Sequence, residues 1–197
     1  MINKAMDYAR RIFDGDGSGH DFDHTLRVYR MALRIAEAEG ADSEIVALAA
    51  LLHDVDDRKL SPLTCEHKDR AVAFLRQNGY ENEKIRIIVE IISEVSFSSG
   101  AGKPSTLEGC CVQDADRLDA IGAIGIGRTF AFGGSRGRRM HDPNGVDATS
   151  SIQHFYDKLL RLKDLMNTET GKQMAIHRDA YLREFLEEFY AEWDGIR

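Results

Sequence analysis

The chain has 197 residues, 43% of them hydrophobic, and its formal net charge at pH 7 is −7. This length and hydrophobic fraction predict one globular domain with a well-filled core. The acidic total excludes a non-specific grip on duplex nucleic acid, because such a grip relies on many cationic contacts to phosphate. Small anionic substrates stay compatible with it, since they respond to the local field rather than to the net charge.

The number of cysteines and the length of the apolar runs indicate in which cellular compartment the protein works. Three cysteines, Cys65, Cys110 and Cys111, are too few for a disulfide framework and predict a reducing environment. No run reaches about 18 apolar residues, and the N-terminal region lacks an apolar signal segment. We therefore expect a cytoplasmic protein with no membrane partner.

Apolar residues recur at spacings of three and four through most of the chain, and no convincing run alternates with period two. The pattern predicts an all-α fold, a single-domain helical bundle spanning 1–197. Its core covers about 20–125, and a helical pair follows at about 150–194. The expected helical segments are 2–13, 24–39, about 43–54, 66–77, one from Asn82, one from about 105, and those around 152–166 and 181–193.

Several helix ends are marked by residues with a known preference for them. Gly40 suits the left-handed position after a helix, and Asp42 or Ser43 can cap the next one. Ser105 and Glu108 form a capping-box pattern, although the following glycine weakens it. The residues between the third and fourth helices, 55–64, are interpreted as a polar connection.

Two further segments have unusual composition. Residues 110–132 are rich in small residues, and their glycines predict helices packed closely together: Gly122, Gly125 and Gly127. Residues 133–149 form the longest polar stretch and contain three arginines, Arg136, Arg138 and Arg139. That stretch either closes over phosphates or forms a disordered surface segment, and its composition favours the second slightly.

A histidine and an aspartate, His53 and Asp54, end the apolar run that begins near Ile45. Imidazole is the commonest side-chain metal ligand, and a carboxylate is a hard oxygen donor. Adjacent residues of a helix point about 100° apart, so both can reach one ion only at a helix end, which is where this pair falls. A His-Asp pair alone is weak, because titratable groups are often structural.

Two more residues strengthen the metal interpretation. His24 begins one expected helix and Asp116 lies in another, so a bundle could bring them to His53 and Asp54. Two neutral imidazoles and two carboxylates would hold one divalent cation with nearly cancelling charge. Mixed nitrogen and oxygen ligands suit Mn, Fe, Co, Ni or Zn, and Mg less readily.

The four residues form a His…His-Asp…Asp set that resembles the signature of the HD-domain metal-dependent phosphohydrolase superfamily. The resemblance extends to the surrounding motifs, which occur in the order the family shows: His20-Asp21-x-Asp23-His24-Thr25-x-Arg27, Leu51-Leu52-His53-Asp54-x-x-Asp57-x-Lys59 and Gln113-Asp114-Ala115-Asp116-Arg117-Leu118-Asp119. A later motif, His154-Phe155-Tyr156-x-Lys158-Leu159-Leu160, is similar to the tail of a small single-domain bacterial subgroup.

The resemblance implies roles for particular residues. His24, His53, Asp54 and Asp116 would be the metal ligands, with Asp116 favoured over Asp114. Asp57 and His20 are candidates for proton transfer, because a carboxylate or imidazole near a cation can act as acid or base. The groups that would neutralise phosphate are Arg27, Lys59 and Arg117.

Some members of the subgroup split nucleoside triphosphates into monophosphate and pyrophosphate, and the resemblance implies that reaction here, with a metal-activated water. A 5′-nucleotidase or phosphodiesterase with the same metal site is the alternative among enzymes. A non-catalytic nucleotide-sensing module is the alternative from another class. The expected partner is a nucleotide or other phosphate ester, and the sequence leaves a homodimer, the native metal and the base preference open.

Overall fold

The structure is a computed structural model that describes residues 1–13, 21–57, 61–95 and 102–197. Every regular element in these ranges is helical, which confirms the all-α fold, and none of the described helices is long and apolar enough to cross a membrane. The elements are α1 (Ile2–Ile12), α2 (Phe22–Glu39), α3 (Ser43–Leu52), α4 (Asp69–Gln77), α5 (Asn82–Val95), α6 (Leu107–Asp119), α7 (Gly122–Ser135), α8 (Ser151–Asp157), the 3-10 helix η2 (Leu159–Leu165) and α9 (Glu169–Trp193).

The helices group into two compact units, Met1–Asp116 and Arg117–Arg197. The expectation of a single domain spanning 1–197 stays a prediction, and each unit is described by itself.

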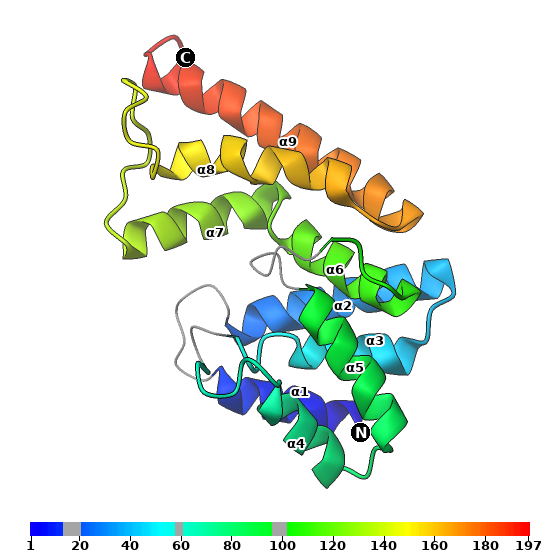
Figure 1. Cartoon of the computed structure of the whole chain (residues 1–197). Helices are drawn as coiled ribbons and strands as arrows, with labels where there is room; N and C mark the ends of the chain where they lie inside the picture. The colour runs from blue at the N-terminus through cyan, green and yellow to red at the C-terminus, as the bar shows by residue number, and fades with distance from the viewer. Residues whose placement is uncertain (14–20, 58–60, 96–101) are drawn as a thin grey trace. The chain divides into compact units, whose positions relative to one another are not determined.

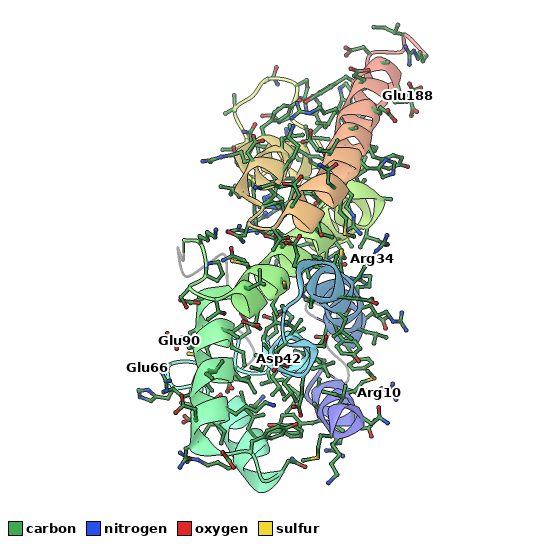
Figure 2. The ribbon with its side chains drawn as sticks, turned by 90° about the vertical axis from the view of Figure 1, so that its right-hand side faces the viewer. Arg10, Arg34, Asp42, Glu66, Glu90 and Glu188 are labelled. Carbon is green, nitrogen blue, oxygen red and sulfur yellow. The ribbon has the colours of Figure 1, made fainter. Side chains whose placement is uncertain are left out.

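Helix α3 is the centre of the N-terminal unit. All seven residues from Val46 to Leu52 are buried, and α1, α2 and α5 pack against the helix (Figure 1). A helix that is apolar on every side must be covered on every side, which explains its place among three neighbours. Helix α2 is amphipathic instead: Val28 and Ile35 are buried, while Arg34 points outward (Figure 2).

The connection from α2 to α3 forms as the sequence predicts. Gly40 takes the left-handed conformation with φ of 79°, and its N–H donates to the Ala36 carbonyl. The Asp42 carboxylate then accepts hydrogen bonds from the N–H groups of Glu44 and Ile45, at 2.9 and 3.1 Å. These two caps determine where α3 begins, and the helix is ten residues long, from Ser43 to Leu52.

Two other helices begin differently from the prediction. Helix α4 begins at Asp69 rather than at residue 66, after Lys68 in the left-handed region with φ of 54°. At the start of α6 the hydroxyl of Thr106, not that of Ser105, accepts a hydrogen bond from the third N–H along, that of Gly109. Glu108 accepts instead from the N–H of Asp42, so the capping-box pattern is used for a long-range contact.

The C-terminal unit contains α7, α8, η2 and α9, which lie alongside one another in Figure 1. Its core includes Phe155, Leu162 and Leu182. The continuous apolar pattern at 152–166 is divided into two elements, because the backbone leaves the helical region at Lys158 (φ −134°, ψ −58°). Helix α9 extends over 25 residues and begins well before the predicted segment.

The polar stretch between α7 and α8 is ordered, so the expectation of a disordered segment is wrong. The buried carboxylate of Asp142 accepts hydrogen bonds from three backbone N–H groups, those of Asn144, Val146 and Asp147. The Arg139 carbonyl accepts from the N–H of Ser151, at the start of α8. The stretch contains enough internal acceptors to build its own turn, which composition alone does not reveal.

We expect the glycines of α7 to differ sharply in their tolerance of a side chain. A Cβ on Gly125 would lie 2.2 Å from the carbonyl oxygen of Ala120, whereas a Cβ on Gly127 would meet nothing within 4 Å. Gly125→Ala should therefore destabilise the protein by about 1–3 kcal/mol. Gly127→Ala should be neutral or stabilising by up to about 1 kcal/mol, because alanine favours helix. Urea unfolding of the two variants checks this, and equal shifts of the midpoint would contradict it.

Candidate metal centre

His53 and Asp54 lie in the turn that immediately follows α3. His53 is the C-terminal cap residue of the helix, and the turn continues with hydrogen bonds from Val55 N–H to the Leu52 carbonyl and from Asp57 N–H to the Asp54 carbonyl. The pair therefore sits at a helix end, as expected. The turn brings the two side chains together, with 3.2 Å between His53 Nε2 and Asp54 Oδ2.

His24 reaches the same place from the first turn of α2. The carboxylate of Asp21 caps this helix by accepting the N–H of His24 at 2.7 Å, which fixes the backbone that carries the imidazole. His24 Nε2 lies 3.5 Å from Asp54 Oδ2, and the two imidazole rings are 5.4 Å apart at 68°. One ligand atom from each of His24, His53 and Asp54 lies within 4.8 Å of the others.

Asp116 approaches this set from α6. Its Oδ1 is 3.5 Å from His24 Nε2, and its side chain is 26% exposed, while the His24 side chain is almost fully buried. Two ligand atoms that each lie about 2.0–2.2 Å from one ion are separated by roughly 3.0–3.5 Å, depending on the coordination angle. The contacts of Asp54 with His24 and His53, at 3.5 and 3.2 Å, therefore have the spacing of ligands that share one cation, whereas Asp116 is placed by its 3.5 Å contact with His24.

The imidazole of His53 is oriented for ligation. Its Nδ1 lies 2.8 Å from the Ala50 carbonyl, which can only accept, so Nδ1 carries a proton. Nε2 is turned toward the site, and this buried nitrogen makes no hydrogen bond of good geometry. Buried polar atoms are nearly always satisfied, and a cation at this point would satisfy this one. The residues present therefore fit a divalent metal.

The charges around His53 also favour a cation. Burial by itself lowers the pKa of His53, but the carboxylates of Asp54 and Asp116 outweigh burial and raise the pKa to about 9. The same negative charges would attract any cation held between them.

The other aspartates of α6 lie in different surroundings. Asp114 is fully buried in the helix. Asp119 accepts a hydrogen bond from Arg128 at 2.7 Å, within the C-terminal unit. Asp116 is the aspartate of α6 whose carboxylate lies 3.5 Å from His24 Nε2.

The structure describes only some of the residues that are predicted to act on the substrate. His20 and Lys59 lie outside the described residues. Asp57 is half-buried in the turn that carries Asp54, and Arg27 is half-buried on α2, three residues after His24 and therefore on the same helix face. Their roles stay predictions.

Arg117 and His154 belong to the C-terminal unit. Arg117 is buried, and its guanidinium donates a hydrogen bond to the Leu165 carbonyl. His154 is half-buried, and its pKa is lowered by burial and by the nearby charges of Lys158 and Arg138. The role predicted for Arg117 also stays a prediction.

Asp56 is a residue whose place sequence reasoning missed. It belongs to the predicted polar connection, yet it is fully buried and accepts hydrogen bonds from two backbone N–H groups at the start of α4. Its partners lie 14 and 15 residues away, so no local pattern indicates the contact.

A helical unit in which His24, His53 and Asp54 converge defines a candidate metal-binding protein of helical architecture, and comparisons with known proteins identify the family. The HD domain family matches residues 21–121. An HD-superfamily hydrolase from Bacillus thuringiensis is 43% identical, with a TM-score of 0.83, over 98% of this chain and 97% of that one.

A second relative, YpgQ of Bacillus subtilis, is 39% identical over 96% of this chain and 92% of its own length. Its crystal structure in complex with ADP has a TM-score of 0.84 and 36% identity in the structural alignment, over 100% of both chains. The chain belongs to the HD-domain family, and it is a phosphohydrolase of that superfamily. Membership favours an enzyme over a nucleotide-sensing module.

We expect His53→Ala to abolish stoichiometric metal binding, because it removes one of the three side chains whose ligand atoms converge. His67→Ala is the matched control, since His67 is an exposed histidine of the same unit. Elemental analysis after metal loading measures both. A full equivalent of metal in His53→Ala would place the ion elsewhere.

Substitutions of Asp114 and Asp116 in α6 test which aspartate is the fourth ligand. Asp116→Asn should weaken the affinity for Mn²⁺ by more than about 10-fold, because it removes a charge next to His24, whereas Asp114→Asn should weaken the affinity less. Isothermal titration calorimetry of both variants measures the difference. The reverse order would make Asp114 the ligand.

Proposed function

We propose that this enzyme hydrolyses nucleoside triphosphates to monophosphate and pyrophosphate at one divalent cation. The ligands are His24, His53, Asp54 and Asp116. The observation that carries the proposal is the convergence of His24, His53 and Asp54, with Asp116 in contact with His24. Mixed nitrogen and oxygen ligands favour Mn, Fe, Co, Ni or Zn over Mg.

A bound divalent cation would lower the pKa of water and polarise a phosphoryl oxygen. The chain's own residues supply the rest of the chemistry. The Ala50 carbonyl holds the His53 ring in one tautomer, and the capping carboxylate of Asp21 holds the start of α2. Asp116 forms the more exposed edge of the ligand set, where a phosphate can approach.

One metal ion does not neutralise all the negative charge of a triphosphate, so the proposal also requires cationic side chains. Arg27 lies on the same face of α2 as His24 and offers a planar fork for two phosphate oxygens. Lys59 and Arg117 are the further phosphate-binding residues in this proposal. Asp57 follows the Asp54 ligand by three residues in one turn, which favours it as the group that takes a proton from the attacking water, with His20 as the second group for proton transfer.

Support for a nucleotide comes from YpgQ, which matches this chain from end to end and binds ADP. ADP contains the α–β phosphoanhydride bond that the proposed reaction breaks. Attack at the α-phosphorus releases pyrophosphate, a stable anion whose charge is spread over several oxygens, so it is a good leaving group.

Hydrolysis in ¹⁸O-labelled water distinguishes the site of attack. We expect the metal-loaded protein to place the label in the nucleoside monophosphate and none in pyrophosphate, measured by mass spectrometry. His53→Ala, purified identically, should lose at least about 100-fold of this turnover, since even residues that only orient ligands typically cost about 10–100-fold.

The other products point to other enzymes. Label in pyrophosphate would mean attack at the β-phosphorus, and labelled inorganic phosphate with a diphosphate would mean attack at the terminal group. Hydrolysis of monophosphates without turnover of any triphosphate would support a 5′-nucleotidase. Hydrolysis of diesters alone would support a phosphodiesterase.

A further inference from the structure

The buried carboxylate of Asp56 lies two residues after one proposed ligand, Asp54, and connects the turn to a different helix. Its Oδ1 accepts from Arg70 N–H at 3.2 Å, and its Oδ2 accepts from Ala71 N–H at 3.0 Å. Both oxygens are thus used, and both donors belong to the first turn of α4.

Helix α4 needs this carboxylate, because its own start lacks a cap. Lys68, the residue at the N-cap position, makes no side-chain hydrogen bond to the helix. The first N–H groups of a helix have no partner inside it, and the helix dipole places partial positive charge there. Asp56 supplies the acceptor and the counter-charge from 14 residues away.

The neighbouring residue strengthens the same connection. The Val55 carbonyl accepts from the Ser61 hydroxyl at 3.1 Å and from the Arg70 guanidinium at 3.5 Å. Two consecutive residues, Val55 and Asp56, are therefore bound to the start of α4 and to the connection that precedes it. Within the turn itself, the backbone hydrogen bonds are those from Val55 to Leu52 and from Asp57 to Asp54.

We infer that Asp56 is a positioning residue of the metal centre: by capping α4 it fixes the turn that carries His53 and Asp54. This inference rests on the proposed function, in that it takes His53 and Asp54 as ligands. Residues that orient metal ligands typically contribute about 10–100-fold to affinity or activity. When Asp56 is lost, the turn keeps His53 and Asp54 but loses the hydrogen bonds of Asp56 to α4.

The connection works in both directions, because coupling between two sites is reciprocal. A cation bound by His53 and Asp54 fixes the turn and so strengthens the hydrogen bonds of Asp56 to α4. In the wild-type protein, Zn²⁺ should therefore slow hydrogen exchange at the N–H groups of Arg70 and Ala71, although α4 provides none of the proposed ligands.

Four variants separate positioning from stability. Asp56→Ala removes both acceptors, and Asp56→Asn keeps one carbonyl oxygen of the same size. Phe74→Leu disturbs the packing of α4, where Phe74 stacks on Tyr8 at 4.8 Å, but leaves Asp56 intact. Glu66→Ala removes an exposed carboxylate from the same connection and controls for charge (Figure 2).

Titration calorimetry with Mn²⁺ and urea unfolding are measured on each variant. We expect Asp56→Ala to weaken Mn²⁺ affinity by about 10–100-fold and Asp56→Asn to weaken it less. Phe74→Leu should lower the unfolding midpoint yet keep its Mn²⁺ affinity within about twofold, and Glu66→Ala should change neither.

Unchanged Mn²⁺ affinity in both Asp56 variants, with a lowered unfolding midpoint, would overturn the inference and leave Asp56 as a helix cap only. Equal loss of affinity in Phe74→Leu would also overturn it. If Asp56→Ala fails to fold, Asp56→Asn and the exchange rates of the wild-type protein decide the question. Absence of Mn²⁺ binding in the wild-type protein would instead refute the proposed function.

Discussion

The end of α3 is the constraint on which the candidate site depends. Consecutive side chains of an α-helix point about 100° apart, so His53 and Asp54 could not face one ion from within it. Helix α3 ends at Leu52, and the turn brings His53 Nε2 and Asp54 Oδ2 to 3.2 Å. The apolar residues before them are buried on every side, so the core of the unit determines where that turn lies.

The site concentrates charge where charge is costly. Burial opposes a proton on His53, yet the carboxylates of Asp54 and Asp116 raise its pKa to about 9, so attraction exceeds desolvation there. The same carboxylates would attract a divalent cation, which would take the place of the proton on His53 Nε2. The net charge of −7 is therefore no obstacle to a phosphate substrate, because the local field belongs to the cation and to nearby groups such as Arg27.

Local patterns predicted what local physics determines. Gly40 and Asp42 end and begin helices through their own backbone and side-chain preferences, and both were predictable. The hydrogen-bond partners of Asp56 and Glu108 were not predictable from local patterns. Asp56 bonds to residues 14 and 15 positions away, and Glu108 bonds to a residue 66 positions away. The meeting of His24 with the turn after α3 was predictable only through the resemblance to a family, since no spacing rule specifies which helices pack together.

The proposed ligands come from three separate segments, α2, the turn after α3 and α6, and this has an energetic consequence. An unfolded chain cannot hold His24, Asp54 and Asp116 together, so a cation that binds them stabilises the folded state alone. Without a cation, the carboxylates of Asp54 and Asp116, each 3.5 Å from His24 Nε2, would repel each other. Cation binding and folding of the N-terminal unit therefore reinforce each other, and Asp56 is the residue through which α4 would share in that coupling.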